Sequence, residues 1–525
     1  MSLKFILQLV AQNSKFVIAL MSGVLMGATV APFNVWFFAW FALAPLWILL
    51  VEASKKPKPE KNRFFYPLFW GIGYHGVALS WITGLHPLTW MGIPWLTSVA
   101  IVIFAWTFIT LWGAALVTIW ASCFIWICQK AKISSITRII IGTALWCLLE
   151  KICSLGPLWW SSLSYTQSPH NLVILHLGQL SGPSTVNAAI VAVNGLIAEA
   201  WIHQGKKSLS KNFSLHFLPI GLFLALHLVG FYLYNHPIAK PQESALKVGI
   251  VQGNIPNRIK FNGDGLRQAV EGYTAGYLKL VGQGVDAVLT PEGALPYFSP
   301  DIIDSSLVAA VRKKGVVAWI GGFAERANSN NYANSLFTFT KNGEIYSHFE
   351  KSKLVPLGEY VPFEEVLGKL IRRLSPVTAR QVPGVANQVF DTPFGRAIAG
   401  ICYESAFSEQ FRRQAAAGGQ FILTASNNDP YNIAMQSQHH AQDIMRAVET
   451  DRWAARATNT GLSAFVDPHG NTLWISGHRT YEAHAETIYR RQTTTLYVRL
   501  GDWLTPFLVG AGVLFWCVDI RTKEL

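Results

Sequence analysis

The sequence predicts a helical membrane domain, then an α/β domain outside the membrane, then a final membrane span. Half of the 525 residues are hydrophobic and only 14% are charged, which is typical of a membrane protein. No Lys, Arg, Asp or Glu occurs from Phe64 to Gln129, whereas residues 240–500 carry the mixed charge of a soluble domain. We therefore expect a seven-span transmembrane domain at residues 1–240, an α/β domain at 241–500, and an eighth span with a tail at 501–525.

Eight apolar stretches are candidate membrane spans, because a helix that crosses the bilayer needs roughly 20 mostly apolar residues. The fourth stretch is long for a single span. It fits one tilted helix with an interfacial extension, or two short helices. The eight stretches are residues 15–31, 34–53, 65–84, 94–128, 137–153, 183–202, 214–235 and 503–520.

Basic residues between the spans predict the orientation of the chain. The connections at 54–63, 130–138 and 205–211 each carry three or more Lys or Arg, whereas those at 31–36 and 85–94 carry none. Basic connections stay in the cytoplasm, so both termini are expected there and the α/β domain outside it. An eight-span pore is the alternative, but the spans lack the paired charges of an ion pathway.

The region after residue 240 alternates strand-like and helix-like segments, which indicates a layered α/β fold. Expected helices lie at 265–283 and 436–457, among strands at 245–254, 287–293, 316–325, 332–340, 396–405, 421–427 and 462–470. The region has no phosphate-binding glycine motif and no Cys/His cluster, so neither a cofactor nor a metal is expected. The basic residues that give the net charge of +13 flank apolar spans, which argues against nucleic-acid binding.

Three residues of this region form a set suited to acyl transfer. Cys402 follows a strand-like run and differs from the other five cysteines, which lie in or beside apolar spans. A thiol attacks as the thiolate, so it needs a base and a positive neighbour. Glu292 can take the thiol proton, and Lys351 with the backbone N–H of Tyr403 can stabilise an oxyanion. Each residue alone also fits a structural role: a solvated turn, a surface lysine or a packing cysteine.

The motifs around these residues resemble those of the nitrilase superfamily, in the order Glu, Lys, Cys. They read "PEGALP", "EKSKLVPLGEYVPF" and "GICYESAF". "LVPLGEYVPF" and "VQGNIP" are similar in particular to the apolipoprotein N-acyltransferase family. So are "GATVAPFNVW", "GIGYHGVALSWI" and "GQLSGPSTVNAAIVAVNGLIA" in the membrane half. The resemblance covers nearly the whole chain and implies an αββα sandwich for residues 241–500.

The resemblance implies a ping-pong acyl transfer at the outer face of a bacterial inner membrane. Cys402 would take an acyl chain from a phosphatidylethanolamine-like phospholipid and pass it to the N-terminal amine of a diacylated apolipoprotein. Glu292 would be the base, and Lys351 would stabilise the oxyanion. No cofactor would take part, and the protein would be a monomer. Further site residues implied by the resemblance are Tyr403, Glu404, Glu359, Trp160 and Phe261.

Two departures and two other functions stay open. Phe261 stands where the family commonly has Trp, and the loop at 426–440 lacks the family's Trp-Phe pair. Glu404 also fits a solvated turn, and Trp160 also fits lipid-facing packing. Residues 360–371 are a candidate lid. The first alternative is a membrane-anchored amidase or nitrilase that uses the same triad. The second is a lipid-binding scaffold that lost its activity, or a transporter with an appended sensor domain.

Overall fold

The computed structural model describes residues 3–55, 63–130, 133–204, 209–326, 331–356, 358–360 and 380–524. The chain divides into two compact units. A helical unit comprises Met1–Leu155, Trp160–His236 and Asp502–Leu525, and a sheet unit comprises Gly156–Trp159 and Pro237–Gly501.

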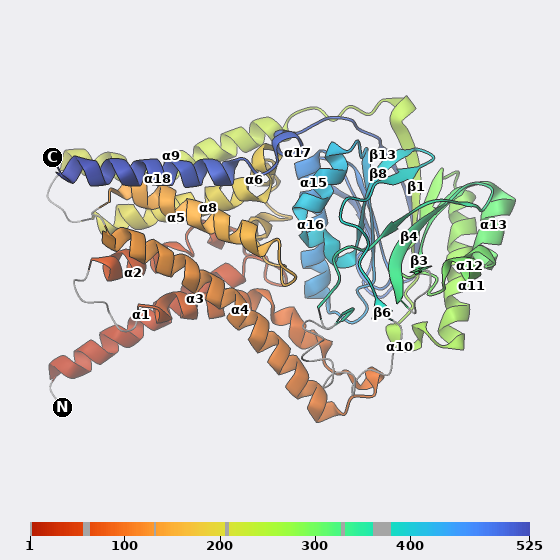
Figure 1. Ribbon diagram of the computed structural model, residues 1–525, viewed down its shortest axis with the longest axis horizontal. Helices are drawn as coiled ribbons and strands as arrows, with labels where there is room; N and C mark the ends of the chain where they lie inside the picture. The colour runs from red at the N-terminus through yellow and green to blue at the C-terminus, as the bar shows by residue number, and fades with distance from the viewer. Residues whose placement is uncertain are drawn as a thin grey trace. The chain divides into compact units, whose positions relative to one another are not determined.

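A helix overlaps each of the eight expected spans (Figure 1). Short helices precede, extend or connect several of them: η1 (Trp36–Trp40), η2 (Ser80–Leu85), η3 (Thr89–Met91), η4 (Leu163–Gln167), α6 (Leu172–Leu175) and α7 (Gly178–Ser181). The eight main helices are α1 (Leu3–Gly27), α2 (Ala44–Ser54), α3 (Phe65–Ala78), α4 (Trp95–Lys130), α5 (Ser135–Cys153), α8 (Pro183–Ile202), α9 (Leu209–Tyr234) and α18 (Leu504–Glu524).

Length and composition allow five segments of the described chain to cross a membrane. They are Trp36–Ser54, Trp95–Lys130, Pro183–Ile202, Phe217–Tyr234 and Leu504–Thr522. The long fourth stretch is one continuous helix, α4, of 36 residues. At 1.5 Å per residue it is about 54 Å long, well beyond the ~30 Å hydrocarbon core of a bilayer.

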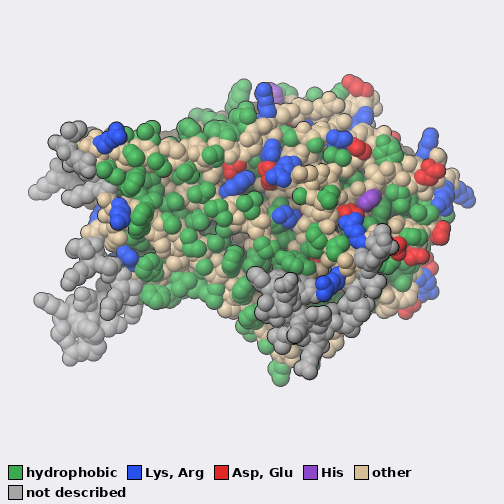
Figure 2. Space-filling view, viewed as in Figure 1, with side chains coloured by type: hydrophobic (Ala, Val, Ile, Leu, Met, Phe, Trp, Pro, Cys, Tyr) green, Lys and Arg blue, Asp and Glu red, His purple; other side chains and the backbone are tan. Residues whose placement is uncertain are grey.

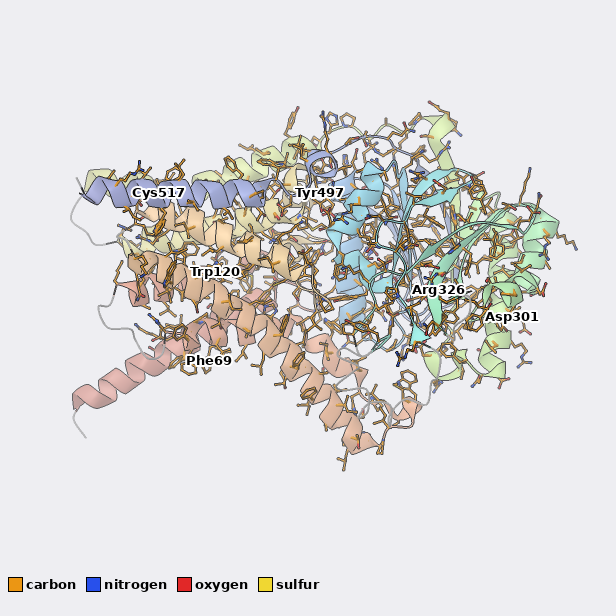
Figure 3. The ribbon with its side chains drawn as sticks, in the orientation of Figure 1. Phe69, Trp120, Asp301, Arg326, Tyr497 and Cys517 are labelled. Atoms are coloured by element: carbon orange, nitrogen blue, oxygen red, sulfur yellow. The ribbon has the colours of Figure 1, made fainter. Side chains whose placement is uncertain are left out.

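The helical unit exposes large apolar side chains that a water-soluble bundle would bury. Leu228 on α9 is 69% exposed and Phe507 on α18 is 63% exposed. Figure 2 shows hydrophobic side chains spread over this unit. Inside it, Trp120 of α4 is fully buried, while Cys517 lies on the exposed side of α18 (Figure 3). An apolar surface of this extent is typical of a lipid-facing protein.

Two acidic side chains near the ends of expected spans are fully partnered inside the helical unit. The guanidinium of Arg138 contacts both oxygens of Glu199, at 2.7 and 2.5 Å. Glu150 accepts hydrogen bonds from Trp146 Nε1, Ser162 Oγ, Asn187 Nδ2 and the N–H of Leu163. A buried carboxylate needs such partners, so both residues tie helices and loops together. The expectation that the spans lack paired charges is therefore wrong at this point, because Arg138 and Glu199 lie in two different expected spans.

The sheet unit contains two mixed sheets. The first has the order β13-β1-β2-β3-β4-β5, with β6 paired to β4, and the second has the order β12-β11-β10-β9-β8-β7. The strands of the first are β1 (Ala245–Gln252), β2 (Ala287–Leu289), β3 (Val317–Glu325), β4 (Asn331–Phe339), β5 (Ile345–Glu350), β6 (Arg380–Gln381) and β13 (Glu482–Tyr489). Those of the second are β7 (Phe390–Thr392), β8 (Gly395–Ile401), β9 (Phe421–Ser426), β10 (Ala454–Thr458), β11 (Ala464–Val466) and β12 (Thr472–Ile475).

The strand period of two sorts the apolar side chains into layers. In β1, Val248 and Ile250 join a core between the sheets with Ala399 and Ile401 of β8. Val251 instead joins a second core beneath α11 (Gly263–Val281) and α13 (Ser306–Lys314). On the second sheet, Gly400 of β8 lies against Phe411 of α15 (Ser408–Ala416).

The outer helix α16 (Ile433–Thr450) contacts β10 and β11 of the second sheet. Helices therefore cover the outer faces of two stacked sheets (Figure 1). The expected fold class, a polytopic helical domain with an αββα sandwich, is confirmed. The helix expected at 436–457 is wrong at its end. Asp451 adopts a left-handed φ of 55° after Thr450, and residues 454–458 form the buried strand β10.

Strands of both sheets end close to the candidate site residues. Glu292 follows β2, Lys351 follows β5 and Cys402 follows β8. β2 and β3 are parallel, and β5 shares their direction because two antiparallel pairings separate it from β3. The carboxyl ends of β2 and β5 therefore lie at one edge of the first sheet, where open α/β sheets place their ligands.

Candidate active site

Cys402 sits on a strained turn at the end of β8. Its φ of 52° lies in the left-handed region, and the 3-10 helix η6 (Cys402–Ala406) starts at this residue. A residue with a side chain costs about 1–3 kcal/mol in such a conformation, so the surroundings must hold it there. Cys402 is buried, at 6% exposure, and belongs to the core between the two sheets. Strained residues of this kind cluster at active sites.

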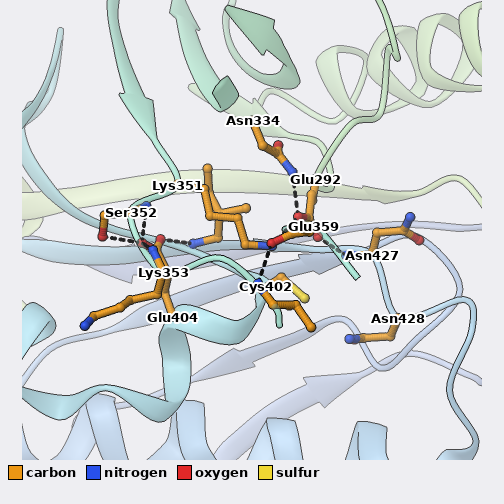
Figure 4. A network of polar contacts seen from close by, with 12 residues as sticks. Glu292, Asn334, Lys351, Ser352, Lys353, Glu359, Cys402, Glu404, Asn427 and Asn428 are labelled. Carbon is orange, nitrogen blue, oxygen red and sulfur yellow. Dashed lines mark hydrogen bonds and ion pairs between the residues drawn. The ribbon is translucent and has the colours of Figure 1, made fainter. Parts of the chain in front are cut away.

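Lys351 is fully buried between two carboxylates (Figure 4). Its Nζ lies 2.9 Å from Oε1 of Glu292 and 2.6 Å from Oε1 of Glu359. Burial alone would lower the pKa of Lys351, but Glu292, Glu359 and the nearby Cys402 together raise it well above its usual value. The site therefore contains a permanent ammonium, which can stabilise negative charge on a substrate oxygen.

Glu292 is held by groups that leave part of its carboxylate available. Oε1 receives Lys351 and the Nδ2 amide of Asn334, the latter at 2.7 Å. Oε2 receives the backbone N–H of Asn427 at 2.8 Å. An ionised carboxylate has about four lone-pair directions, so Oε2 retains room for one more proton. This geometry suits a general base.

The Cys402 thiol rests in its neutral form. Burial raises its pKa, the charge of Glu292 raises it further, and Lys351 and the backbone of Asn427 only partly oppose these effects. The pKa ends well above the usual cysteine value of about 8.5. A thiol in this state reacts only if a neighbour takes its proton during attack, so the arrangement requires a base.

Glu404 is fully buried rather than a solvated turn residue. Its Oε1 accepts the N–H groups of Ser352 and Lys353 and the Ser352 hydroxyl, at 2.8, 3.2 and 2.8 Å. Its Oε2 accepts the N–H of Ile401 at 2.8 Å. Burial raises the pKa of Glu404, and these hydrogen bonds oppose the rise. The carboxylate therefore fastens the backbone after Lys351 to the backbone before Cys402.

Glu359 and Tyr403 hold the site from two other sides. Besides Lys351, Glu359 accepts the N–H of Val355 at 2.8 Å. The Tyr403 phenol accepts the N–H of Trp159 at 3.0 Å and lies 2.7 Å from the carbonyl oxygen of Pro157. The Tyr403 side chain is engaged there, so a contribution of Tyr403 to the site would come from its backbone N–H.

The other two expected residues are placed differently. Phe261 follows α10 (Asn257–Lys260) directly and is 67% exposed, unlike the buried triad. Trp160 belongs to the helical unit, where its ring lies 5.3 Å from that of Trp81. The candidate lid at 360–371 lies outside the described residues except for Tyr360.

The loop that lacks the family's Trp presents another aromatic residue to the site. Burial, then Cys402 and the site carboxylates, raise the pKa of the Tyr431 phenol, which places this ring among the charges of the site. The amide of Asn427, in the same loop, donates to Asn257 Oδ1 and receives Asn459 Nδ2. Asn427 follows β9 and Asn459 follows β10, so the ends of these two strands together form this side of the site.

The sequence did not single out Lys260. Lys260 is only 4% exposed, and its Nζ donates to the backbone carbonyl oxygen of Glu292 at 3.2 Å. Burial lowers the pKa of Lys260 to about 8, while Glu292, Asp429 and Cys402 counteract part of that fall. Gly293 makes room for it, because a Cβ there would meet the Lys260 ammonium at 3.2 Å. The one available signal was a lysine inside the "VQGNIPNRIKF" stretch.

Two family models match the chain and cover both units. Residues 22–196 match the apolipoprotein N-acyltransferase N-terminal domain, and residues 247–490 match the carbon-nitrogen hydrolase domain. Within the described ranges, no group of three His, Cys, Asp or Glu side chains is placed to hold a metal ion.

Curated relatives match over almost their full length. An apolipoprotein N-acyltransferase of Nostoc sp. is 62% identical over 94% of this chain and 97% of its own. That of Synechocystis sp. is 44% identical over 94% of this chain and 99% of its own. Among solved structures, an amidase of the nitrilase superfamily from Nesterenkonia AN1 aligns with 49% of this chain and 95% of its own, at 19% identity and a TM-score of 0.36. These sequence relatives span both units and show that the chain belongs to the apolipoprotein N-acyltransferase family.

Proposed function

We propose that this chain transfers an acyl chain from a membrane phospholipid to the N-terminal amine of diacylated apolipoproteins, through a thioester on Cys402. The observation that carries the proposal is the buried Lys351 between Glu292 and Glu359, whose charges act on the Cys402 thiol. In a member of this family, Glu292, Lys351 and Cys402 supply the base, the oxyanion stabiliser and the nucleophile of acyl transfer.

In the first half-reaction, the Cys402 sulfur attacks the ester carbonyl of the donor while Glu292 takes the thiol proton. A carbon–sulfur bond forms, and the carbonyl oxygen becomes an oxyanion that Lys351 and the Tyr403 N–H stabilise. When this intermediate collapses, the ester C–O bond breaks. Glu292 returns the proton to the departing alkoxide, so the products are lysophospholipid and acyl-enzyme.

In the second half-reaction, the acceptor's neutral amine attacks the thioester carbon. The same two donors stabilise the oxyanion, and Glu292 takes a proton from the attacking nitrogen. The carbon–sulfur bond then breaks and Glu292 protonates the departing sulfur. The amide product leaves, and Cys402 is again a neutral thiol, the form that burial favours at rest.

The finer assignments concern substrates, residues and topology. We assign a phosphatidylethanolamine-like donor, with Trp160 and Phe261 as substrate contacts, in a monomer of the bacterial inner membrane. Removing an acyl chain from the bilayer costs about 0.8 kcal/mol per CH₂, so the nucleophile must work at the membrane surface.

Basic connections predict cytoplasmic termini and a periplasmic sheet unit. A reporter fused near residue 208 should then be cytoplasmic and one near residue 300 should not; the reverse overturns the orientation.

The function is tested with purified full-length protein, labelled phosphatidylethanolamine and a diacylated lipopeptide. The expected product is triacylated lipopeptide, and Cys402→Ser should abolish it. Release of free fatty acid without lipopeptide acylation would instead indicate a hydrolase. Unchanged transfer in both Cys402→Ala and Glu292→Gln would overturn the assignment of the triad.

A further inference from the structure

A buried chain of hydrogen bonds connects helix α16 to the backbone of Cys402. The ring of His439, on α16, places Nε2 2.8 Å from the carbonyl oxygen of Cys402. Its Nδ1 lies 3.2 Å from Asn428 Nδ2, and Asn428 Oδ1 lies 3.2 Å from Arg456 Nη2. Arg456 in turn is paired with Asp443. Each of these four side chains is at most 1% exposed.

The fixed donors and acceptors at the two ends of this chain of hydrogen bonds assign the groups between them. A carbonyl oxygen only accepts, so His439 Nε2 carries a proton and donates it to Cys402. A guanidinium only donates, so the oxygen of the Asn428 amide faces Arg456 and its NH₂ group faces Nδ1. Nδ1 therefore accepts, and the ring is neutral. Burial, and then the charge of Arg456, lower the pKa of His439 well below its usual value, which agrees with this assignment.

The carbonyl that His439 holds belongs to the same peptide group as the N–H of Tyr403. A trans peptide is planar, so fixing the direction of its C=O also fixes its N–H, which points the opposite way. A hydrogen bond to the carbonyl also polarises the peptide and strengthens the N–H as a donor. The same contact restrains Cys402 in its left-handed conformation, with φ of 52°.

We propose that His439 is a positioning residue that aims and polarises the oxyanion-binding peptide between Cys402 and Tyr403, and that Asp443, Arg456 and Asn428 fix its tautomer. A second contact from the same helix supports this. Arg446 lies seven residues further along α16, on the same face, and its Nη1 donates to the Ser405 carbonyl at 2.9 Å. Helix α16 therefore holds η6 at two carbonyls.

The proposal rests on the proposed function, and its test separates thiol reactivity from oxyanion binding. Acyl-enzyme formation from labelled phosphatidylethanolamine requires both. Alkylation of Cys402 by iodoacetamide requires the thiol but forms no oxyanion. Both rates are measured on the full-length protein by following the Cys402 peptide in the mass spectrometer.

His439→Leu should slow acylation at least about tenfold, toward the ~10²–10³-fold cost of losing an oxyanion donor, while alkylation stays within about threefold of wild type. His439→Gln keeps a donor to the carbonyl and should recover acylation to within about fivefold of wild type. The matched control is His440→Leu: it removes the adjacent buried imidazole, which contacts Thr472 instead, and should leave both rates within about twofold.

Acylation by His439→Leu within about threefold of wild type would overturn the inference, and so would a parallel loss of alkylation, which would mean a displaced nucleophile. If His439→Leu does not fold, Asn428→Ala takes its place. It frees Nδ1 and should slow acylation at least about threefold with alkylation unchanged; unchanged acylation would overturn the inference. A wild-type protein that forms no acyl-enzyme overturns the proposed function, and this inference with it.

Discussion

Lys351 Nζ lies 2.9 Å from Oε1 of Glu292, and this contact gives the two oxygens of the carboxylate different tasks. Oε1 is occupied by the ammonium and by Asn334, whereas Oε2 receives one backbone N–H, from Asn427. The ammonium thus stays beside the base without filling the oxygen that can accept a proton. In the proposed function, this single pair would supply both the base and the positive charge of the acyl-transfer site.

Glu292→Gln should stop proton removal while keeping the size of the side chain. The neutral Cys402 thiol then has no base, so the acylation rate should fall by ~10²–10⁴-fold, the usual contribution of general-base catalysis. Rapid-quench measurement of acyl-enzyme gives the rate. Glu344→Gln, in an exposed turn, is the control and should acylate normally. Acylation by Glu292→Gln within tenfold of the control would rule out the base.

The pH dependence of Cys402 alkylation should be shifted to high pH. The thiolate is the reactive form, and the folded protein raises the pKa of this thiol above its unfolded value of about 8.5. The iodoacetamide rate at Cys402 should therefore still be rising at about pH 9.5. In denatured protein the same peptide should titrate near pH 8.5. A plateau below pH 8 in the folded protein would contradict the neutral resting thiol.

Lys260→Met should slow acylation in a pH-dependent way. The ammonium beside Glu292 and Cys402 favours negative charge in the transition state, and it is lost as pH rises through the lowered pKa of about 8. The ratio of wild-type to variant rates should be about tenfold at pH 7 and approach one above about pH 9. Lys279→Met, on the exposed side of α11, is the control. A ratio independent of pH would assign Lys260 a structural role.

Glu404→Gln should weaken the link between the two backbone segments that carry Lys351 and Cys402. The amide has one acceptor oxygen, so its NH₂ group must face one of the backbone N–H donors. The expected loss is about 2 kcal/mol of unfolding free energy, together with slower acylation. Thermal unfolding at pH 7 measures the first effect. Glu409→Gln, which breaks part-exposed ion pairs on α15, should cost less than about 1 kcal/mol. Equal losses in the two variants would refute the special position of Glu404.

Local patterns predicted much of the architecture. Each expected span overlaps a helix, because long apolar runs between basic connections are a local signal. Span ends were harder to place. Residues 36–40 form the 3-10 helix η1 before α2 starts at Ala44, and α3 gives way to η2 after Ala78. A periodic apolar count does not distinguish a 3-10 turn from an α-helix.

The sequence predicted a site residue only where a short motif around that residue indicated its role. Glu292, Lys351 and Cys402 each stand in a short motif, and the structure brings their side chains together. Lys260 and His439 were missed because no motif identified them, and their contacts with residues 32 and 37 positions away form only in the folded chain. Their role comes from strand order and helix packing, which no local pattern reports.

Intact-protein and peptide mass spectrometry can detect the covalent acyl group that the proposed mechanism places on Cys402. Full-length protein incubated with phosphatidylethanolamine, without an acceptor, should gain the mass of one acyl chain on the peptide that contains Cys402. Hydroxylamine should remove that mass. A diacylated lipopeptide should also remove it, and one triacylated lipopeptide should form for each acyl group that leaves Cys402. An unmodified Cys402 peptide in protein that still acylates the lipopeptide would rule out a thioester on Cys402.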